Sequence, residues 1–367
     1  MTIKGIKLGE RLSKYPIMQG GMGIGVSLSK LAAAVANAGG IGIISGAQPG
    51  YKEEDFRTDN EAANLRGLKK EIRIAKDLSP KGMIGVNFLA SVTNYSDMVK
   101  LAVKEKVDLI ISGAGLPKNL PSFVKGTDTK IAPVVSSGKA ASTITRLWLK
   151  KYDYMPDCII VEGPKAGGHL GFSFEDLKGN LPNLKDIVAE VVQAVKDFEI
   201  KYNKKIPVIA AGGVYDGQDI GEMLEAGAAG VQMATRFVAT HECDAHPNFK
   251  QAYVDAQAED IGLIVSPVGL PGRALKNKFV ASVEAANEKI KYCYRCLKGC
   301  NPKEAPYCIT EALITSVEGD VDNGLVFLGT NAEKVDKIVS VKSLMEDLMT
   351  ETHDYLNQKK LQASNSF

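Results

Sequence analysis

Short apolar runs recur along the chain, and each is followed by a small-residue loop and, in most cases, by a stretch with helical periodicity. The runs are almost continuously apolar, which is typical of strands buried on both faces of a parallel sheet. The pattern therefore predicts strands that alternate with surface helices. Eight runs have this character, at residues 16–18, 41–44, 83–86, 109–111, 131–135, 158–161, 207–211 and 230–233.

The stretches between most of these runs have the spacing of amphipathic helices. Strands that alternate with helices form a parallel sheet, and eight such units favour closure into a (β/α)8 TIM barrel. An open doubly wound sheet is the alternative, although it would normally use fewer strands. The expected helices lie at residues 28–38, 59–77, 95–105, 138–150, 184–198 and 217–226.

Small and polar residues follow every one of the eight runs, as in Gln19-Gly20-Gly21, at Asn87 and in Gly212-Gly213. Turns in any fold favour such residues, so one such loop would carry little information. A barrel, however, assembles its site from the loops at the carboxyl ends of its strands. The recurrence at all eight positions predicts one site built from several loops.

The alternation breaks down between residues 240 and 310, where helical stretches at 249–258 and 279–291 are separated by irregular sequence. We expect a helical insertion, or lid, after the eighth strand. The chain is thus predicted to have three regions. They are a barrel over residues 1–240, a lid over 241–310, and a return to the barrel with a terminal helix over 311–367.

Composition excludes several classes of partner. The 367 residues include 45 Lys plus Arg and 43 Asp plus Glu, for a net charge of +2, which gives no electrostatic basis for binding nucleic acid or an anionic membrane. No apolar run reaches the roughly 18 residues of a membrane span. The first residues lack the apolar stretch of a secretory signal, so a cytoplasmic location is expected.

Two glycine-bearing segments suggest a phosphate-binding end of the barrel. Gly212-Gly213 follows the seventh run, and Thr235 follows the eighth. The loops after strands seven and eight of a barrel often bind phosphate, because glycine lets backbone N–H groups approach the oxygens. Simple turns after buried strands are the alternative.

Four cysteines crowd together near the C-terminus with the spacing C-x2-C-x3-C-x7-C. Four thiolates at such a spacing can hold a [4Fe–4S] cluster or a tetrahedral zinc ion. Unliganded thiols that pack the lid are the alternative. The candidate metal ligands are Cys293, Cys296, Cys300 and Cys308.

His169 is the candidate catalytic residue. It follows Gly167-Gly168 in the loop after the sixth run, where a barrel places site residues. A histidine has an unperturbed pKa near 6.5, so it can accept or donate a proton near neutrality. A loop histidine satisfied by backbone groups is the alternative.

Five segments together resemble the nitronate monooxygenase family, formerly called 2-nitropropane dioxygenases. The segment Ala166-Gly167-Gly168-His169 is the most specific of them, and it is followed in order by Gly212-Gly213 and by Gln232-x-x-Thr235. The flavin-dependent enoyl-acyl-carrier-protein reductases are related to this family and share most of these motifs. The five segments are residues 16–22, 85–87, 162–171, 210–213 and 230–237.

This resemblance implies FMN at the barrel mouth and His169 as the catalytic residue. It also implies that the flavin ring lies against Gly21 and Met22. The other flavin contacts that it implies are Asn87, Glu162, Gly167, Gly213, Gln232, Met233, Ala234 and Thr235.

Three functions are consistent with these features. The first is oxidation of alkyl nitronates by O2 to a carbonyl compound and nitrite. The second is reduction of enoyl thioesters with NAD(P)H as the hydride donor. The third is a barrel that binds a phosphorylated ligand without redox chemistry. His169 is a proton-handling position in both redox reactions, so it does not choose between them. The sequence also leaves the oligomeric state open, a homodimer included.

Overall fold

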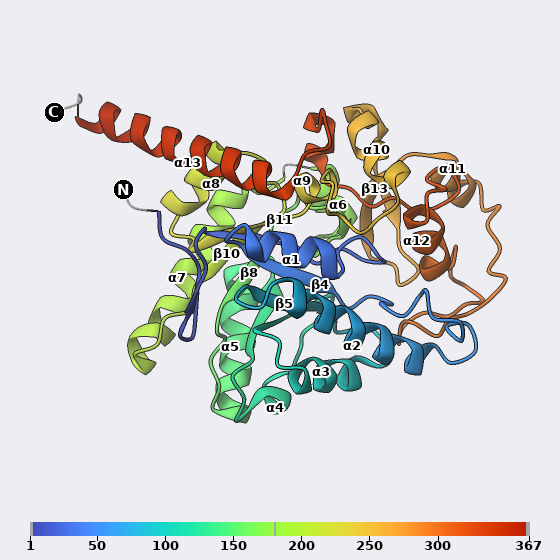
Figure 1. Cartoon of the computed structure of the whole chain (residues 1–367), viewed down its shortest axis with the longest axis horizontal. Coiled ribbons are helices and arrows are strands. Elements are labelled where there is room, and N and C mark those ends of the chain that lie inside the picture. Colours follow the sequence, from blue (N-terminus) through green and yellow to red (C-terminus); the bar gives the residue numbers. More distant parts are fainter. Residues whose placement is uncertain (1–2, 180, 365–367) are drawn as a thin grey trace.

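The computed structural model describes residues 3–179 and 181–364, and at its centre eight parallel strands close into a barrel (Figure 1). Neighbouring strands follow one another along the chain, and the last strand pairs with the first. Each apolar run forms one strand, so the predicted (β/α)8 barrel is confirmed. The strands are β3 (Ile17–Gln19), β4 (Ile41–Ser45), β5 (Met83–Leu89), β6 (Leu109–Gly113), β7 (Lys130–Val135), β8 (Ile159–Glu162), β10 (Val208–Ala211) and β11 (Gly230–Met233).

Helices surround the barrel, and all six that the sequence predicts between strands are present. Their amphipathic faces pack on the outer side of the strands. Short α4 (Pro121–Val124), α6 (Phe174–Lys178) and α9 (Thr235–Val238) lie in the loops. The predicted six are α1 (Ser29–Asn37), α2 (Asn60–Leu78), α3 (Tyr95–Lys104), α5 (Gly138–Tyr152), α7 (Leu184–Tyr202) and α8 (Gly217–Glu225).

The sequences of the strands are almost continuously apolar because each strand is buried on both faces, in two separate apolar cores. In β4 every residue is buried, with Ile41 and Ile43 in the core inside the barrel and Ile44 in the core between strands and helices. The antiparallel hairpin β1 (Lys7–Leu8) and β2 (Arg11–Leu12) contributes Leu8 to the inner core. The inner core leaves the carboxyl ends of the strands free to form a site.

The insertion after β11 contains helices, as predicted, and also a β-hairpin that the sequence analysis did not predict. Its helices are α10 (Pro247–Asp255), η1 (Ala258–Asp260) and α11 (Lys278–Glu284), so α11 ends seven residues before the predicted end at 291. The hairpin consists of β12 (Ile261–Val265) and β13 (Pro271–Leu275). A third strand, β9 (Gly168–His169), comes from the barrel loop about 100 residues earlier and pairs with β13, so the sheet requires a long-range contact.

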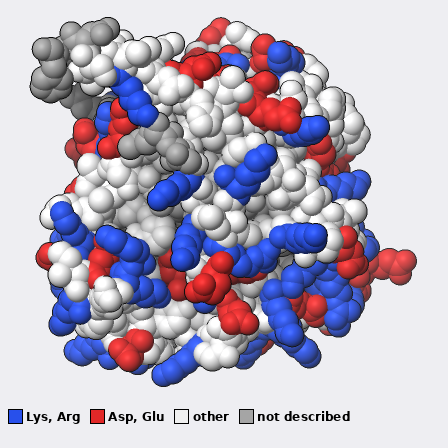
Figure 2. Space-filling model, turned by 60° about the vertical axis from the view of Figure 1, so that its left-hand side comes forward, with Lys and Arg blue, Asp and Glu red and all other residues white. Residues whose placement is uncertain are grey.

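The chain returns along the barrel after the insertion. Helix α12 (Ile309–Val317) belongs to the lid side in Figure 1, and η2 (Thr330–Lys334) leads to α13 (Val341–Ser364), which packs along α8 and α1. No helix in the described ranges combines the length and apolarity needed to cross a bilayer. Figure 2 shows basic and acidic side chains interspersed on one face, in keeping with the net charge of +2.

Asp244 fastens the start of the insertion to the barrel. Its carboxylate accepts hydrogen bonds from the N–H groups of Leu28 (2.7 Å), Leu31 (3.2 Å) and Lys30 (3.3 Å), which are the free donors at the start of α1. We expect Asp244→Ala to lower the free energy of unfolding by about 1–3 kcal/mol, measured by urea denaturation, because these donors lose their acceptor.

Asp97→Ala is the matched control for this change. Asp97 forms an exposed ion pair with Lys100, so its loss is expected to cost less than about 1 kcal/mol. Equal effects of the two substitutions would contradict the fastening role of Asp244.

Candidate active site

One cavity of about 570 Å³ lies at the carboxyl ends of the barrel strands. Residues at the end of every strand line it, from Gly20 after β3 to Gln232 on β11. The insertion and the returning chain cover its other side with apolar side chains that include Phe249, Leu297 and Phe327. The predicted arrangement, one site built from several strand-end loops, is therefore what the fold produces.

All eleven residues predicted for catalysis or cofactor binding line this single cavity. They come from five different strand ends, far apart in the sequence. Their proximity is a finding, and their individual roles stay predictions. The residues are Gly21, Met22, Asn87, Glu162, Gly167, His169, Gly213, Gln232, Met233, Ala234 and Thr235.

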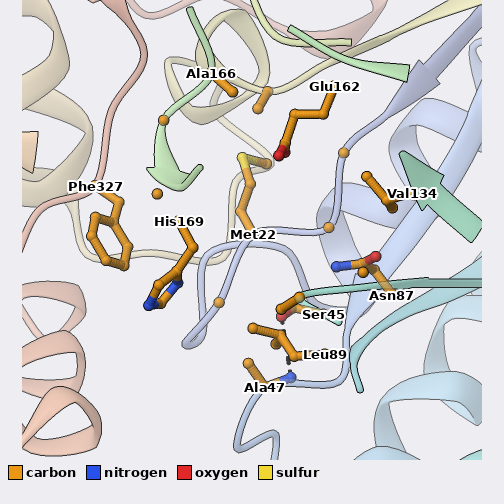
Figure 3. Close-up of a pocket in the computed structure, with 18 of the residues that line it drawn as sticks. Met22, Ser45, Ala47, Asn87, Leu89, Val134, Glu162, Ala166, His169 and Phe327 are labelled. Carbon is orange, nitrogen blue, oxygen red and sulfur yellow. Dashed lines mark hydrogen bonds between the residues drawn. The ribbon is translucent and has the colours of Figure 1, made fainter. Parts of the chain in front are cut away.

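His169 is held by the lid hairpin. As part of β9 it pairs with Gly272 of β13, and its ring meets the edge of Phe327 at a centroid distance of 5.4 Å. Figure 3 shows both rings at the same side of the cavity. Burial lowers the pKa of His169, because a charged imidazolium loses its hydration there. The imidazole is therefore neutral at pH 7 and able to accept a proton.

Glu162 ends β8, and its carboxyl group projects into the same cavity (Figure 3). Desolvation raises the pKa of this carboxyl to about 7, and a hydrogen bond from the backbone of Gly171 opposes the rise. The cavity therefore holds a carboxyl group that changes protonation near neutral pH, in Glu162, together with the imidazole of His169, whose pKa is lowered.

The raised pKa of Glu162 predicts a pH-dependent stability. Between the ordinary value of 4.5 and about 7, the folded state holds a proton that the unfolded state has released. This contribution to stability is present below pH 4.5 and is lost as the pH rises through 7. We expect Glu162→Gln, measured by urea denaturation of the cofactor-free protein, to lose less unfolding free energy between pH 5 and pH 8 than the wild type does. The exposed Glu175→Gln should behave like the wild type, and a Glu162→Gln profile parallel to the wild type would refute the prediction.

Glycines leave room for a ligand on one side of the cavity. Gly212 and Gly213 have φ of +79° and +129°, in the region that only glycine adopts freely. A Cβ on Gly167 would come within 2.4 Å of the Leu328 carbonyl carbon. The position of a Cβ on Gly329 is 3.1 Å from the Lys165 carbonyl oxygen, 3.3 Å from the Thr235 hydroxyl and 3.4 Å from the Gly167 nitrogen. Backbone N–H groups and the Thr235 hydroxyl thus lie close together, in an arrangement that fits an anionic group such as a phosphate. We call Gly167, Gly213, Gly329 and Thr235 the glycine cradle.

Gln232 is a second feature of the cavity that fits a bound ligand. Its Oε1 atom is buried and accepts no hydrogen bond from the described residues, and the residue is one of those that line the cavity. Such an atom is costly to leave unpaired, so a bound ligand with an N–H or O–H group fits there. On the neighbouring strand end, a Cβ on Gly21 would lie 2.4 Å from the Cβ of Asn87, so the first loop can sit against Asn87 only without a side chain at residue 21.

The sequence analysis missed the contribution of the returning chain. Phe327, Leu328, Gly329 and Asn331 line the cavity, and Asn331 donates a hydrogen bond of 2.8 Å to the Gly213 carbonyl. The only sequence signal was an apolar run at residues 325–328 that ends in glycine, like the runs of the barrel strands. Because this run follows the insertion and not a barrel helix, the sequence pattern did not place it at the barrel mouth.

The metal prediction for Cys293, Cys296, Cys300 and Cys308 is not supported. The four thiols line one small cavity of about 30 Å³ in the lid, but the part of the chain that the structure describes contains no group of His, Cys, Asp or Glu side chains placed to hold a metal ion. Sequence spacing fixes which thiols are near one another, whereas a metal also needs converging thiolates. Burial instead raises the pKa values of Cys296, Cys300 and Cys308, which favours neutral thiols.

Comparison with known proteins relates most of the chain to the nitronate monooxygenase family. The sequence profile of the family described as nitronate monooxygenase matches residues 7–351. A probable nitronate monooxygenase of Bacillus subtilis is 27% identical, over 92% of this chain and 95% of that protein. A (3aS,4S,5R,7aS)-5-hydroxy-7a-methyl-1-oxo-octahydro-1H-indene-4-carboxyl-CoA dehydrogenase of Rhodococcus jostii is 30% identical over 74% of this chain, and the match spans 65% of that relative's length.

Solved structures share the fold over nearly the full length. FabK from Thermotoga maritima superposes with a TM-score of 0.74 at 29% identity, covering 95% of this chain and 96% of that chain. A nitroalkane oxidase from Streptomyces ansochromogenes gives a TM-score of 0.73 at 22% identity, over 94% and 98% of the two chains, and this likeness supports the fold alone.

Proposed function

This chain belongs to the nitronate monooxygenase family, and on that premise we propose that it is a flavin oxidoreductase that uses FMN to oxidise alkyl nitronates with O2 to a carbonyl compound and nitrite. One observation carries the proposal. A single cavity unites the glycine cradle around Gly213, the unpaired acceptor of Gln232 and the neutral imidazole of His169.

The residues present fit FMN. Gly167, Gly213, Gly329 and Thr235 would hold the phosphate, because their backbone and hydroxyl donors converge without intervening side chains. Gln232 would accept a hydrogen bond from a polar group of the nucleotide. When bound, FMN supplies the electron transfer of the reaction, whereas the protein supplies orientation and proton handling.

His169 performs the proton chemistry in this proposal. With a neutral nitroalkane as substrate, its neutral imidazole takes the proton from the carbon next to the nitro group, which produces the nitronate. The protonated imidazole then holds the nitronate anion. The rings of Phe327 and Phe249 and the side chain of Leu297 cover the cavity with apolar surface. This cover excludes water, which strengthens the attraction between an imidazolium and an anion.

Anaerobic mixing is the decisive test of this function. The purified protein, reconstituted with FMN, is mixed separately with an alkyl nitronate and with NADH while the flavin absorbance is followed. We expect bleaching by the nitronate, and oxygen uptake with nitrite release once air is admitted and no NADH is present. A protein that cannot be reconstituted with FMN would leave only a barrel that binds a phosphorylated ligand without redox chemistry.

Reduction of an enoyl thioester by NAD(P)H is the second candidate. Apolar side chains that include Tyr253, Ile309 and Leu313 also line the cavity, which suits an acyl chain longer than a small nitronate requires. The name of the Rhodococcus jostii relative, a carboxyl-CoA dehydrogenase, points to a thioester. Bleaching by NADH, with NADH consumption driven by crotonyl or longer enoyl thioesters, would favour this reaction over nitronate oxidation.

A further inference from the structure

Arg273, on β13 of the lid hairpin, is a buried cation that the proposed chemistry does not use. Only 5% of its surface is exposed, and it does not line the cavity. In the described part of the chain no carboxylate neutralises it, and desolvation lowers the pKa of the guanidinium. A buried, unpaired charge is costly, so its hydrogen-bond partners and its effect on the neighbouring loop require explanation.

The partners of Arg273 are two carbonyl groups of the loop that leads to His169. Its Nη1 atom donates to the oxygen of Pro164 at 2.7 Å and to the oxygen of Ala166 at 2.6 Å. The backbone of Arg273 pairs with Gly168 of β9 and accepts a hydrogen bond from the N–H of Leu328 at 3.3 Å. Arg273 therefore joins the barrel loop, the lid hairpin and the returning chain at one point.

These two hydrogen bonds fix the direction of the neighbouring amides. In a trans peptide, the carbonyl of one residue and the N–H of the next point in opposite directions. Because the carbonyls of Pro164 and Ala166 face Arg273, the N–H groups of Lys165 and Gly167 face away from it. Both of these residues line the cavity.

The loop that carries these two N–H groups lies beside the Thr235 hydroxyl and Gly213. The Gly167 nitrogen is 3.4 Å from the Cβ position of Gly329, which is itself 3.3 Å from the Thr235 hydroxyl. Lys165 lies against Gly213, with 3.2 Å between the Lys165 Cβ and the Cβ position of that glycine. The loop held by Arg273 is thus one wall of the proposed phosphate site.

We propose that Arg273 is a positioning residue that orients the amides of Lys165 and Gly167 toward the phosphate group of the flavin nucleotide. The inference rests on the proposed use of FMN. A guanidinium with no carboxylate partner also leaves its positive charge behind the loop, where it favours a dianionic ligand on the other side. Both effects strengthen binding of the phosphate group, and neither acts on binding of the flavin ring.

Comparison of FMN with riboflavin, which lacks the phosphate, tests the inference. The cofactor-free protein is titrated with each ligand, and the dissociation constants are obtained from quenching of flavin fluorescence. We expect Arg273→Met to weaken FMN binding about 10- to 100-fold, since two charge-assisted hydrogen bonds are lost, and to change riboflavin binding less than about threefold. Arg273→Lys, which keeps the charge and an N–H donor, is expected to recover most of the preference for FMN.

Lys276→Met is the matched control, because it removes a positive charge just beyond the end of β13, at an exposed residue whose ammonium group bonds only to the Glu259 carbonyl. It should leave the ratio of the two dissociation constants unchanged. If Arg273→Met does not fold, Arg273→Gln is measured by the same criterion, since its uncharged amide is too short to reach both carbonyls.

The outcomes separate this inference from the function on which it rests. Equal weakening of both ligands, or an unchanged ratio in the Arg273 variants, would overturn the positioning role and leave the use of FMN intact. A wild-type protein that binds neither FMN nor riboflavin would overturn the proposed function and, with it, this inference.

Discussion

Replacement of His169 by alanine is expected to lower kcat/KM for nitroalkane oxidation by roughly 10²- to 10⁴-fold, the usual contribution of a positioned acid or base. The imidazole is neutral because burial lowers its pKa, so the wild type has a proton acceptor in the cavity at pH 7 that the variant lacks. The ring does not belong to the glycine cradle, so FMN should stay bound. Oxygen uptake measures the loss, and the flavin spectrum reports retention of the cofactor.

Two substrates sharpen this test. A neutral nitroalkane needs the proton acceptor, whereas a preformed nitronate does not, so the loss should be larger with the nitroalkane. The control is His353→Ala, which removes an exposed imidazole from α13. Wild-type kcat/KM in His169→Ala with both substrates would refute the catalytic assignment, and equal losses with both would restrict His169 to holding the anion.

Substitution of Gly167 by alanine is expected to weaken FMN binding on the order of 100-fold, comparable to the loss of two charge-assisted hydrogen bonds. The new Cβ would lie 2.4 Å from the Leu328 carbonyl carbon and 2.6 Å from the Gly329 nitrogen. Both neighbours are backbone atoms, which cannot rotate away as a flexible side chain can. The loop or the returning chain must shift, and the cradle opens.

Gly179→Ala is the matched control for this glycine. Its Cβ would meet the Glu175 carbonyl oxygen at 3.4 Å, an ordinary contact, so FMN binding should not change. The dissociation constant from fluorescence quenching is the measurement, and thermal unfolding shows whether each variant is folded. A folded Gly167→Ala protein with the wild-type affinity for FMN would contradict the cradle.

The barrel could be predicted from the sequence because its determinants are local. Each strand is a short apolar run such as residues 41–44, buried on both faces by the two cores, and each predicted helix carries its own amphipathic period. The polar and glycine residues after the runs then had to meet at one end, since parallel strands in a barrel share that end. This reasoning placed His169 at the site, and the resemblance to the nitronate monooxygenase family supplied the ten predicted cofactor residues that line the same cavity.

The sequence by itself therefore determined the barrel and the end of the barrel that holds the site. Only the tertiary structure decided how the site is closed. The pairing of Gly272 with His169, the hydrogen bonds of Arg273 to the loop and the approach of Gly329 to Gly167 all join residues about 100 or more positions apart. Contacts of this kind depend on how the insertion packs on the barrel, and no local period encodes that. The same holds for the four cysteines, whose spacing suggested a metal but whose thiols are not placed to hold one.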